Sequence, residues 1–192
     1  MVLSSLRPTV KRILEKIAIP LSGLNPNIIT LLSIPVAATV PVLVYIEEPG
    51  LAILALLVSG FLDILDGALA RLSGRTTRAG AYLDSMSDRV SDTLYYLALS
   101  LAGYDYRLVV LALGFTITVT YSKARAHSLG GMEYSHRFLE RSDRLIIIVG
   151  LLLVAIYLPG YMQVLMLIYT SLLGIAVAAA FYKGFKVLAE SS

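Results

Sequence analysis

Four aspartates stand in segments that are otherwise strongly apolar, and carboxylates in such surroundings are candidates for chemistry. Asp63 and Asp66 are three residues apart, so they share one face of a helix. Asp84 and Asp88 are four residues apart, with the same consequence. A charged side chain well inside a bilayer costs roughly 2.5–3.5 kcal/mol even on a lenient scale. No Lys or Arg stands between the members of either pair, so something else must compensate their charge.

Divalent cations are the natural compensation for such carboxylates. A short basic connection joins the two apolar segments, which predicts antiparallel neighbouring helices whose aspartates face one cavity. Oxygen ligands suit Mg²⁺ or Mn²⁺, and two such ions would cancel the four negative charges. The sequence therefore predicts a two-metal site. For any single aspartate, the alternative is a buried acid paired with an arginine of another helix.

Small residues mark the helix face that carries the first aspartate pair. They follow one another at spacings of three and four residues, as Gly60, Asp63, Gly67, Ala70 and Gly74. Such a stripe lets another backbone approach closely, but because acids are interleaved with it, we interpret it as a wall for a flat or bulky ligand group. Arg71 stands at the end of this stripe, where a guanidinium can bind phosphate oxygens.

The composition describes the elements that must position these side chains. The chain of 192 residues is 57% hydrophobic and 15% charged, with a mean hydropathy of +0.79. Soluble domains are about 25% charged, and disordered chains have low hydrophobicity, so both classes are excluded. The cations stand at the ends of apolar segments, so the net charge of +3 does not indicate a nucleic-acid partner. No polar linker divides the chain, which predicts a single domain over residues 1–192.

The hydrophobic pattern predicts an all-α polytopic membrane protein. Residues 1–19 form an amphipathic segment that we expect to lie as a helix in the membrane surface. Six apolar segments of membrane-spanning length then predict a six-helix transmembrane bundle over residues 27–186. We place the segments at 27–46, 50–73, 81–102, 107–128, 143–158 and 161–186.

The placement of the basic residues predicts the orientation in the membrane. Nearly all of the 16 Lys and Arg residues stand at the two ends of the chain or in alternate connections. By the positive-inside rule, both termini and both basic connections are cytoplasmic. We therefore expect a multi-pass integral membrane protein whose active site faces the cytoplasm.

The pattern Asp63-x2-Asp66-Gly67-x2-Ala70-Arg71-x8-Gly80-x3-Asp84-x3-Asp88 resembles the signature of the CDP-alcohol phosphotransferases. The resemblance implies a surface helix followed by six spans, a homodimer, and transfer of a phosphoalcohol group from a CDP-lipid donor to an acceptor hydroxyl, with CMP as product. It implies that the four aspartates hold two metal ions per subunit and that Asp88 is the general base. It also implies a CDP-donor pocket formed by Asp66, Gly67, Ala70, Arg71 and Gly80.

A second basic cluster bears on the acceptor. It comprises Lys123, Arg125, Arg141 and Arg144. Several cations at one membrane level suit the phosphate of a phosphorylated polyol, although ordinary positive-inside anchors are the alternative. The stretch "SKARAHSLGG…ERSDRL" resembles the phosphatidylinositol-phosphate synthases and their archaeal counterparts, which implies that this cluster holds the phosphate of inositol phosphate.

Two other functions are consistent with these residues. Glycerol 3-phosphate is also a phosphorylated acceptor and would be used by the same chemistry. An intramembrane metal-binding or ion-transport protein would equally explain carboxylates within apolar helices. Such a protein does not need Gly67, Ala70 and Arg71 beside the aspartates, so we favour the transferase.

Overall fold

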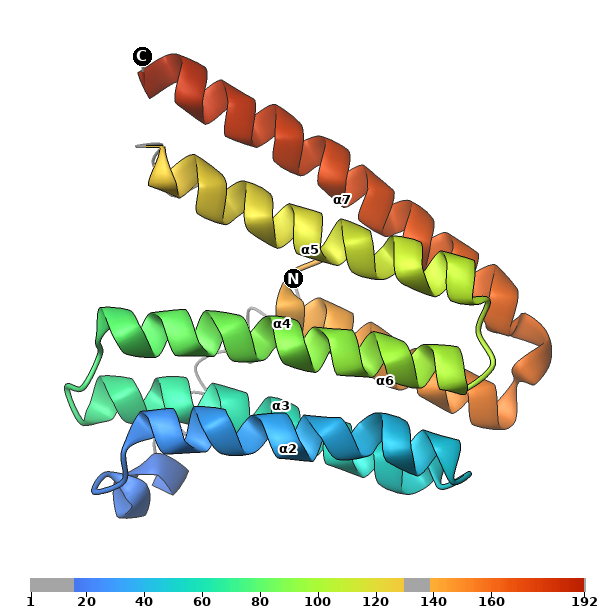
Figure 1. Ribbon diagram of the computed structural model, residues 1–192, viewed down its shortest axis with the longest axis horizontal. Helices are drawn as coiled ribbons and strands as arrows, with labels where there is room; N and C mark the ends of the chain where they lie inside the picture. Colours follow the sequence, from blue (N-terminus) through green and yellow to red (C-terminus); the bar gives the residue numbers. More distant parts are fainter. Residues whose placement is uncertain (1–15, 130–138, 192) are drawn as a thin grey trace. The chain divides into compact units, whose positions relative to one another are not determined.

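The computed structural model describes residues 16–129 and 139–191, and within these ranges the chain is helical, without strands (Figure 1). Most of the predicted surface helix over 1–19 lies outside the described residues; residues 16–18 are helical, and η1 (Ile19–Leu21) follows them. The long helices are α2 (Pro26–Tyr45), α3 (Pro49–Leu72), α4 (Arg78–Leu101), α5 (Tyr106–Ser128), α6 (Arg141–Tyr157) and α7 (Met162–Ser191). The short η2 (Pro159–Tyr161) precedes α7.

The helix ends follow local signals in the sequence. The Asn25 side chain accepts a hydrogen bond from the backbone of Asn27 (3.1 Å), and Pro26 begins α2. After α3, the N–H of Arg75 donates to the carbonyl of Ala70 (3.0 Å), and Gly74 takes a positive φ of 64°. This arrangement is a Schellman motif, in which glycine is favoured. Gly74 therefore caps α3 and does not continue the stripe of small residues along the helix.

Four helical segments of the described chain are long and apolar enough to cross a membrane. They are Pro26–Tyr45, Pro49–Leu72, Tyr106–Ser128 and Pro159–Glu190. Helix α4 is as long as α3 but carries several charged side chains, including Asp84, Asp88 and Asp92. Helix α6 has only 17 residues. The chain is thus an all-helical integral membrane protein, and the total of six spans stays a prediction.

The helices form two compact units, residues 1–43 with 50–94 and residues 44–49 with 95–192. In the first unit, α2 packs on α3 through Ile29, Leu65 and Leu69, which are at most 5% exposed. The Ser59 hydroxyl donates to the carbonyl of Ser33 (2.9 Å) and ties the two helices together. The first unit therefore holds α2, α3 and the part of α4 that carries the aspartates in one packed group.

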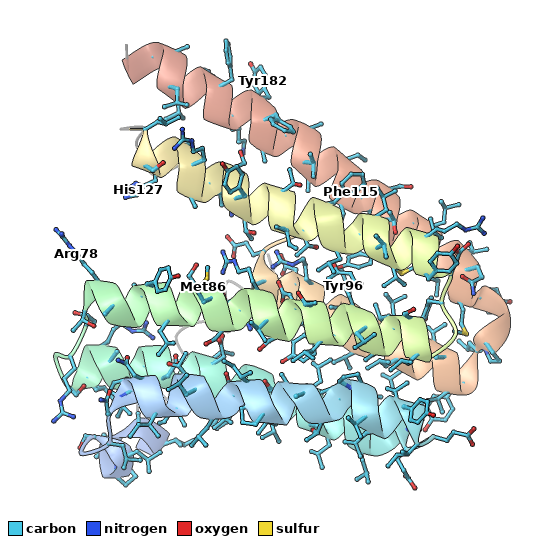
Figure 2. All side chains as sticks on the ribbon, in the orientation of Figure 1. Arg78, Met86, Tyr96, Phe115, His127 and Tyr182 are labelled. Atoms are coloured by element: carbon cyan, nitrogen blue, oxygen red, sulfur yellow. The ribbon has the colours of Figure 1, made fainter. Side chains whose placement is uncertain are left out.

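In the second unit, α5 and α7 run side by side (Figure 1) and α6 also contacts α7. A buried cluster around Val119, Ala176 and Ala180 joins α5 to α7. Tyr96, labelled in Figure 2, adds a polar link, because its hydroxyl lies 2.8 Å from that of Thr116 and 2.7 Å from that of Tyr169. This unit carries the second basic cluster.

Candidate active site

Three aspartates of the motif converge in the first unit. One carboxylate oxygen from each of Asp63, Asp84 and Asp88 lies within 4.8 Å of the other two. At this separation, two unit charges repel by about 3.5 kcal/mol at an effective dielectric constant of about 20. A group of anionic oxygens this close is unfavourable by itself and suits a hard divalent cation, which takes oxygen ligands. The donor set therefore fits Mg²⁺ or Mn²⁺.

Helix geometry explains why these positions meet. Asp66 stands six residues before the end of α3 at Leu72, and Asp84 stands six residues after the start of α4 at Arg78. At a rise of about 1.5 Å per residue, both lie about 9 Å from the connection between the helices. Asp63 and Asp88 stand nine and ten residues from the same ends, or about 14–15 Å. Because the helices are antiparallel, the aspartates form two layers.

Asp66 is not a member of the three-carboxylate group. Its side chain is buried, at 4% exposure, and its Oδ2 accepts a hydrogen bond from the hydroxyl of Thr30 on α2. The spacing of the motif predicts all four aspartates at one site but does not indicate Thr30. A threonine within a helix ordinarily bonds its own backbone, so its position in the sequence carried no signal of this contact.

Gly67 and Arg71 are neighbours on α3. A Cβ atom on Gly67 would stand 3.4 Å from Nη1 of Arg71, so the guanidinium lies along the helix over the glycine. Arg71 is exposed, and Ala70 beside it is half-buried. The glycine thus leaves room for a cationic group that remains accessible to a ligand.

Gly80 is enclosed by polar atoms from two helices. A Cβ atom at this position would stand 3.1 Å from Oδ1 of Asn27 and 3.1 Å from Oγ1 of Thr77. The N–H of Gly80 also donates to Oγ1 of Thr77 (3.0 Å), which fixes the first turn of α4. The absence of a side chain at Gly80 therefore allows the first turn of α2 to approach the first turn of α4.

Asp88 has a cationic neighbour on its own helix. Nη1 of Arg89 lies 3.4 Å from Oδ2 of Asp88 and donates to the carbonyl of Ser85 (2.7 Å). This pair joins adjacent residues of α4 and is partly exposed, so it contributes little to stability. It brings one positive charge to the edge of the acidic group.

The second basic cluster draws its residues from α5 and α6, and a further cation on α7 interacts with it. Lys123 on α5 interacts electrostatically with Arg144 on α6, Lys183 on α7 and Glu140. Arg144 is buried, at 4% exposure, and its Nη1 donates to the carbonyl of Leu139 (3.1 Å), which has a positive φ of 53°. Three cations thus gather around one acid, and Arg144 also holds the backbone that leads into α6.

The other two predicted members of the basic cluster lie at helix ends. Arg125 is exposed in the last turn of α5, and Arg141 is half-buried at the first position of α6. A capping box between Glu140 and Asp143 fixes this start, since the N–H of Glu140 donates to Oδ2 of Asp143 (3.1 Å). Lys183 on α7 adds a further cation beside these residues, through its interaction with Lys123.

Comparisons with known proteins identify the family of this chain. Residues 24–181 match the profile of the CDP-alcohol phosphatidyltransferase family. The archaetidylinositol phosphate synthase of Aeropyrum pernix is 38% identical over 151 residues, which cover 78% of this chain and 75% of that protein. The corresponding synthase of Pyrococcus horikoshii is 36% identical over 149 residues, covering 76% and 79%.

A solved structure has a similar fold. It is the Mycobacterium tuberculosis phosphatidylinositol phosphate synthase with CDP-DAG bound, with a TM-score of 0.79 and 26% sequence identity. The match covers 91% of this chain and 94% of that protein. With the family pattern complete from Asp63 to Asp88 and most of the chain matched, this protein belongs to the CDP-alcohol phosphatidyltransferase family and is a membrane-bound transferase of substituted phosphate groups.

Proposed function

We propose that this enzyme transfers a phosphatidyl or archaetidyl group from a CDP-linked lipid to a hydroxyl of inositol phosphate, with release of CMP. The observation that carries the proposal is the convergence of Asp63, Asp84 and Asp88 within 4.8 Å. Relatives named as archaetidylinositol phosphate synthases support the choice of acceptor. The product is a phospholipid precursor, so the enzyme acts in phospholipid biosynthesis.

The four aspartates of the motif hold two divalent cations per subunit, Mg²⁺ or Mn²⁺. Their donor set is entirely oxygen, which is the preference of these ions. When bound, paired cations about 3.5–4 Å apart stabilise the charge on the attacking and leaving oxygens of a phosphoryl transfer. Asp63, Asp84 and Asp88 already have the proximity that shared ligation needs. Asp66 adds its carboxylate from α3, at the level of Asp84 on α4.

The remaining motif residues bind the CDP donor. Arg71 binds phosphate oxygens of the donor with its exposed guanidinium. Gly67, Ala70 and Gly80 line the cytidine diphosphate pocket; Gly67 leaves room for the guanidinium of Arg71, and Gly80 leaves room for Asn27 and Thr77 beside it. Positioning and electrostatic stabilisation account for most of the catalysis in phosphoryl transfer, so these contacts matter for rate as well as for binding.

Asp88 orients the acceptor hydroxyl and takes its proton. The hydroxyl oxygen forms a bond to the lipid-side phosphorus, and the bond from that phosphorus to the oxygen of CMP breaks. Arg89 contacts Oδ2 of Asp88, so we assign the hydroxyl to the other oxygen. The proton remains on the carboxylate until product leaves, and the leaving oxygen keeps its electron pair as part of the CMP phosphate.

Lys123, Arg125, Arg141 and Arg144 bind the phosphate of the acceptor. The interaction of Lys123 with Arg144 and Lys183 supports this role, because gathered cations are stabilised by an anion. Glu140 also interacts with Lys123. A phosphate group, with its charge near −2 and several acceptor oxygens, suits a group of gathered cations.

The enzyme is a homodimer whose subunits are single domains with six spans, both termini cytoplasmic, and an active site that faces the cytoplasm. The four apolar segments support a multi-pass arrangement. Helix α4 crosses the membrane as a fifth span with its aspartates facing α3, and the 17-residue α6 is the sixth. A helix of about 17 residues is at the lower limit for spanning.

The test offers purified protein a CDP-lipid and Mg²⁺ with one of four acceptors and follows CMP release. The acceptors are inositol phosphate, glycerol 3-phosphate, free inositol and serine. Release that depends on inositol phosphate is expected. CMP release only with glycerol 3-phosphate would show that glycerol 3-phosphate is the acceptor, with the same transfer reaction. Turnover only with free inositol or serine would refute the phosphate pocket, and no release with any acceptor would favour the metal-binding or transport alternative.

A further inference from the structure

Helix α2 touches the motif although it carries none of its residues. Thr30 donates a hydrogen bond to Oδ2 of Asp66 on α3, and Oδ1 of Asn27, one turn earlier, approaches Gly80 on α4. We propose that Thr30 is a positioning residue for Asp66, fixing one carboxylate oxygen so that the other is aimed at the bound cations and donor. This inference rests on the proposed function, because it takes Asp66 to be a ligand there.

The hydroxyl proton of Thr30 goes to Asp66 and not to the helix backbone. Oγ1 lies 3.2 Å from the carbonyl of Pro26 and is also hydrogen-bonded to Oδ2 of Asp66. A hydroxyl has one proton to donate, and a charged carboxylate is a stronger acceptor than a neutral carbonyl. The carbonyl of Pro26 also has the N–H of Thr30 as its regular helical partner. The Thr30 hydroxyl therefore donates its hydrogen bond to Asp66 of the motif.

Burial makes this hydrogen bond hard to replace. Thr30 is 3% exposed and Asp66 is 4% exposed, so bulk water does not reach the pair readily. Removing the hydroxyl would leave a buried carboxylate oxygen without that donor, and the carboxylate could rotate about its side-chain torsions. The three grouped aspartates are within 4.8 Å of one another, and Asp66 accepts its hydrogen bond from a third helix, α2.

Thr30 is itself held in place. Its carbonyl accepts a hydrogen bond from the hydroxyl of Ser33 (2.7 Å), and Ser33 is linked to Ser59 on α3 (2.9 Å). The side chain is β-branched, so its first torsion has few alternatives within a helix. The Thr30 hydroxyl is thus oriented toward Asp66 before any ligand binds, as expected of a positioning residue.

The experiment measures Mn²⁺ binding in the presence of CMP, by electron paramagnetic resonance on the purified full chain, beside steady-state transfer. Loss of a residue that orients a metal ligand typically weakens affinity or activity by about 10- to 100-fold. We expect Thr30→Val to weaken Mn²⁺ binding by about that factor and Thr30→Ser to restore it to within about threefold. The matched control is Thr170→Val, which removes a buried hydroxyl bonded to the carbonyl of Met166 (2.8 Å) in α7. That control should bind Mn²⁺ as the parent does.

The Asp66→Asn variant separates the role of Asp66 in the proposed function from the positioning role of Thr30. If Asp66→Asn binds Mn²⁺ and CMP as well as the parent, the assignment of Asp66 in the proposed function is wrong. If Asp66→Asn loses binding while Thr30→Val keeps it, only the positioning role is refuted. In the Asp66→Asn background, Thr30→Val should have no further effect on Mn²⁺ binding, and an additive loss would also overturn the proposal. If Thr30→Val does not fold, Mn²⁺ binding by Thr30→Ala is compared with Mn²⁺ binding by Thr30→Ser. The unfolding temperatures of both variants, measured without ligand, show that they are folded.

Discussion

Replacing Gly80 by alanine tests the close approach of α2 and α4 quantitatively. The added methyl would stand 3.1 Å from both Oδ1 of Asn27 and Oγ1 of Thr77. These distances are a few tenths of an ångström shorter than comfortable contact, and overpacking of this kind costs about 1–3 kcal/mol. Alanine within a helix recovers about 0.5–1 kcal/mol relative to glycine. The net loss of stability is then between about 0 and 2.5 kcal/mol.

Moving either Thr77 or Asn27 away from the added methyl would disturb a neighbouring helix end. Thr77 caps α4 by accepting the N–H of Gly80 (3.0 Å), so rotating its side chain away loses a cap worth about 1 kcal/mol. Displacing Asn27 instead shifts the first turn of α2, which directly precedes Thr30. Either response disturbs the donor site, so CMP affinity should fall together with stability.

The assay is thermal unfolding of the purified protein with and without CMP and Mg²⁺. The matched control is Gly150→Ala in α6, where a Cβ would meet nothing within 4 Å. Gly80→Ala should lower the unfolding temperature and reduce the CMP-dependent shift, whereas Gly150→Ala should leave that shift unchanged. Equal unfolding temperatures and equal CMP shifts for Gly80→Ala and the parent would refute the reasoning from the close contact.

Three further predictions follow from the described contacts. Asp88→Asn should reduce transfer by at least about 100-fold while the protein stays folded; single-turnover kinetics measure this, and near-normal turnover would remove its assigned role. Arg141→Ala should raise the KM for the phosphorylated acceptor with little change in the KM for the CDP-lipid, and an unchanged acceptor KM would refute the phosphate pocket. The hydrogen bonds from Arg107 hold the pKa of Asp105 below its usual value. Its charge therefore stabilises the fold at neutral pH, and this contribution is lost as the pH falls below about 4. Asp105→Asn, which keeps an acceptor for the start of α5, should lower the unfolding temperature at pH 7 and by less at about pH 3; an equal difference at both pH values would contradict the charge effect.

Local signals in the sequence predict the helices closely. Asn25 and Pro26 mark the start of α2, and Pro159 marks the break before α7. The expected segments begin and end within a few residues of α2 to α6, and α7 continues to Ser191 where the prediction ended at residue 186. The convergence of aspartates on α3 and α4 is also foreseeable, because two helices joined by a short connection bring positions equally far from that connection to the same level.

Contacts made by residues distant in sequence could not be foreseen in this way. Thr30 and Asp66 are separated by 36 positions, and nothing in the local pattern of either residue indicates the other. Arg144 turns its guanidinium to the carbonyl of Leu139, a backbone contact that a charge pattern does not encode. Gly74 fitted the spacing of the small-residue stripe, but spacing alone does not show that the helix has already ended.

The central claim is that the converging aspartates bind divalent cations that hold the donor diphosphate. The most direct measurement is a calorimetric titration of the purified protein with Mn²⁺ in the presence of CMP, for the parent chain and for Asp84→Asn. We predict two ions per subunit for the parent and a loss of at least one of them, with loss of CMP binding, for Asp84→Asn. Identical Mn²⁺ stoichiometry and CMP affinity in the two proteins would contradict the account.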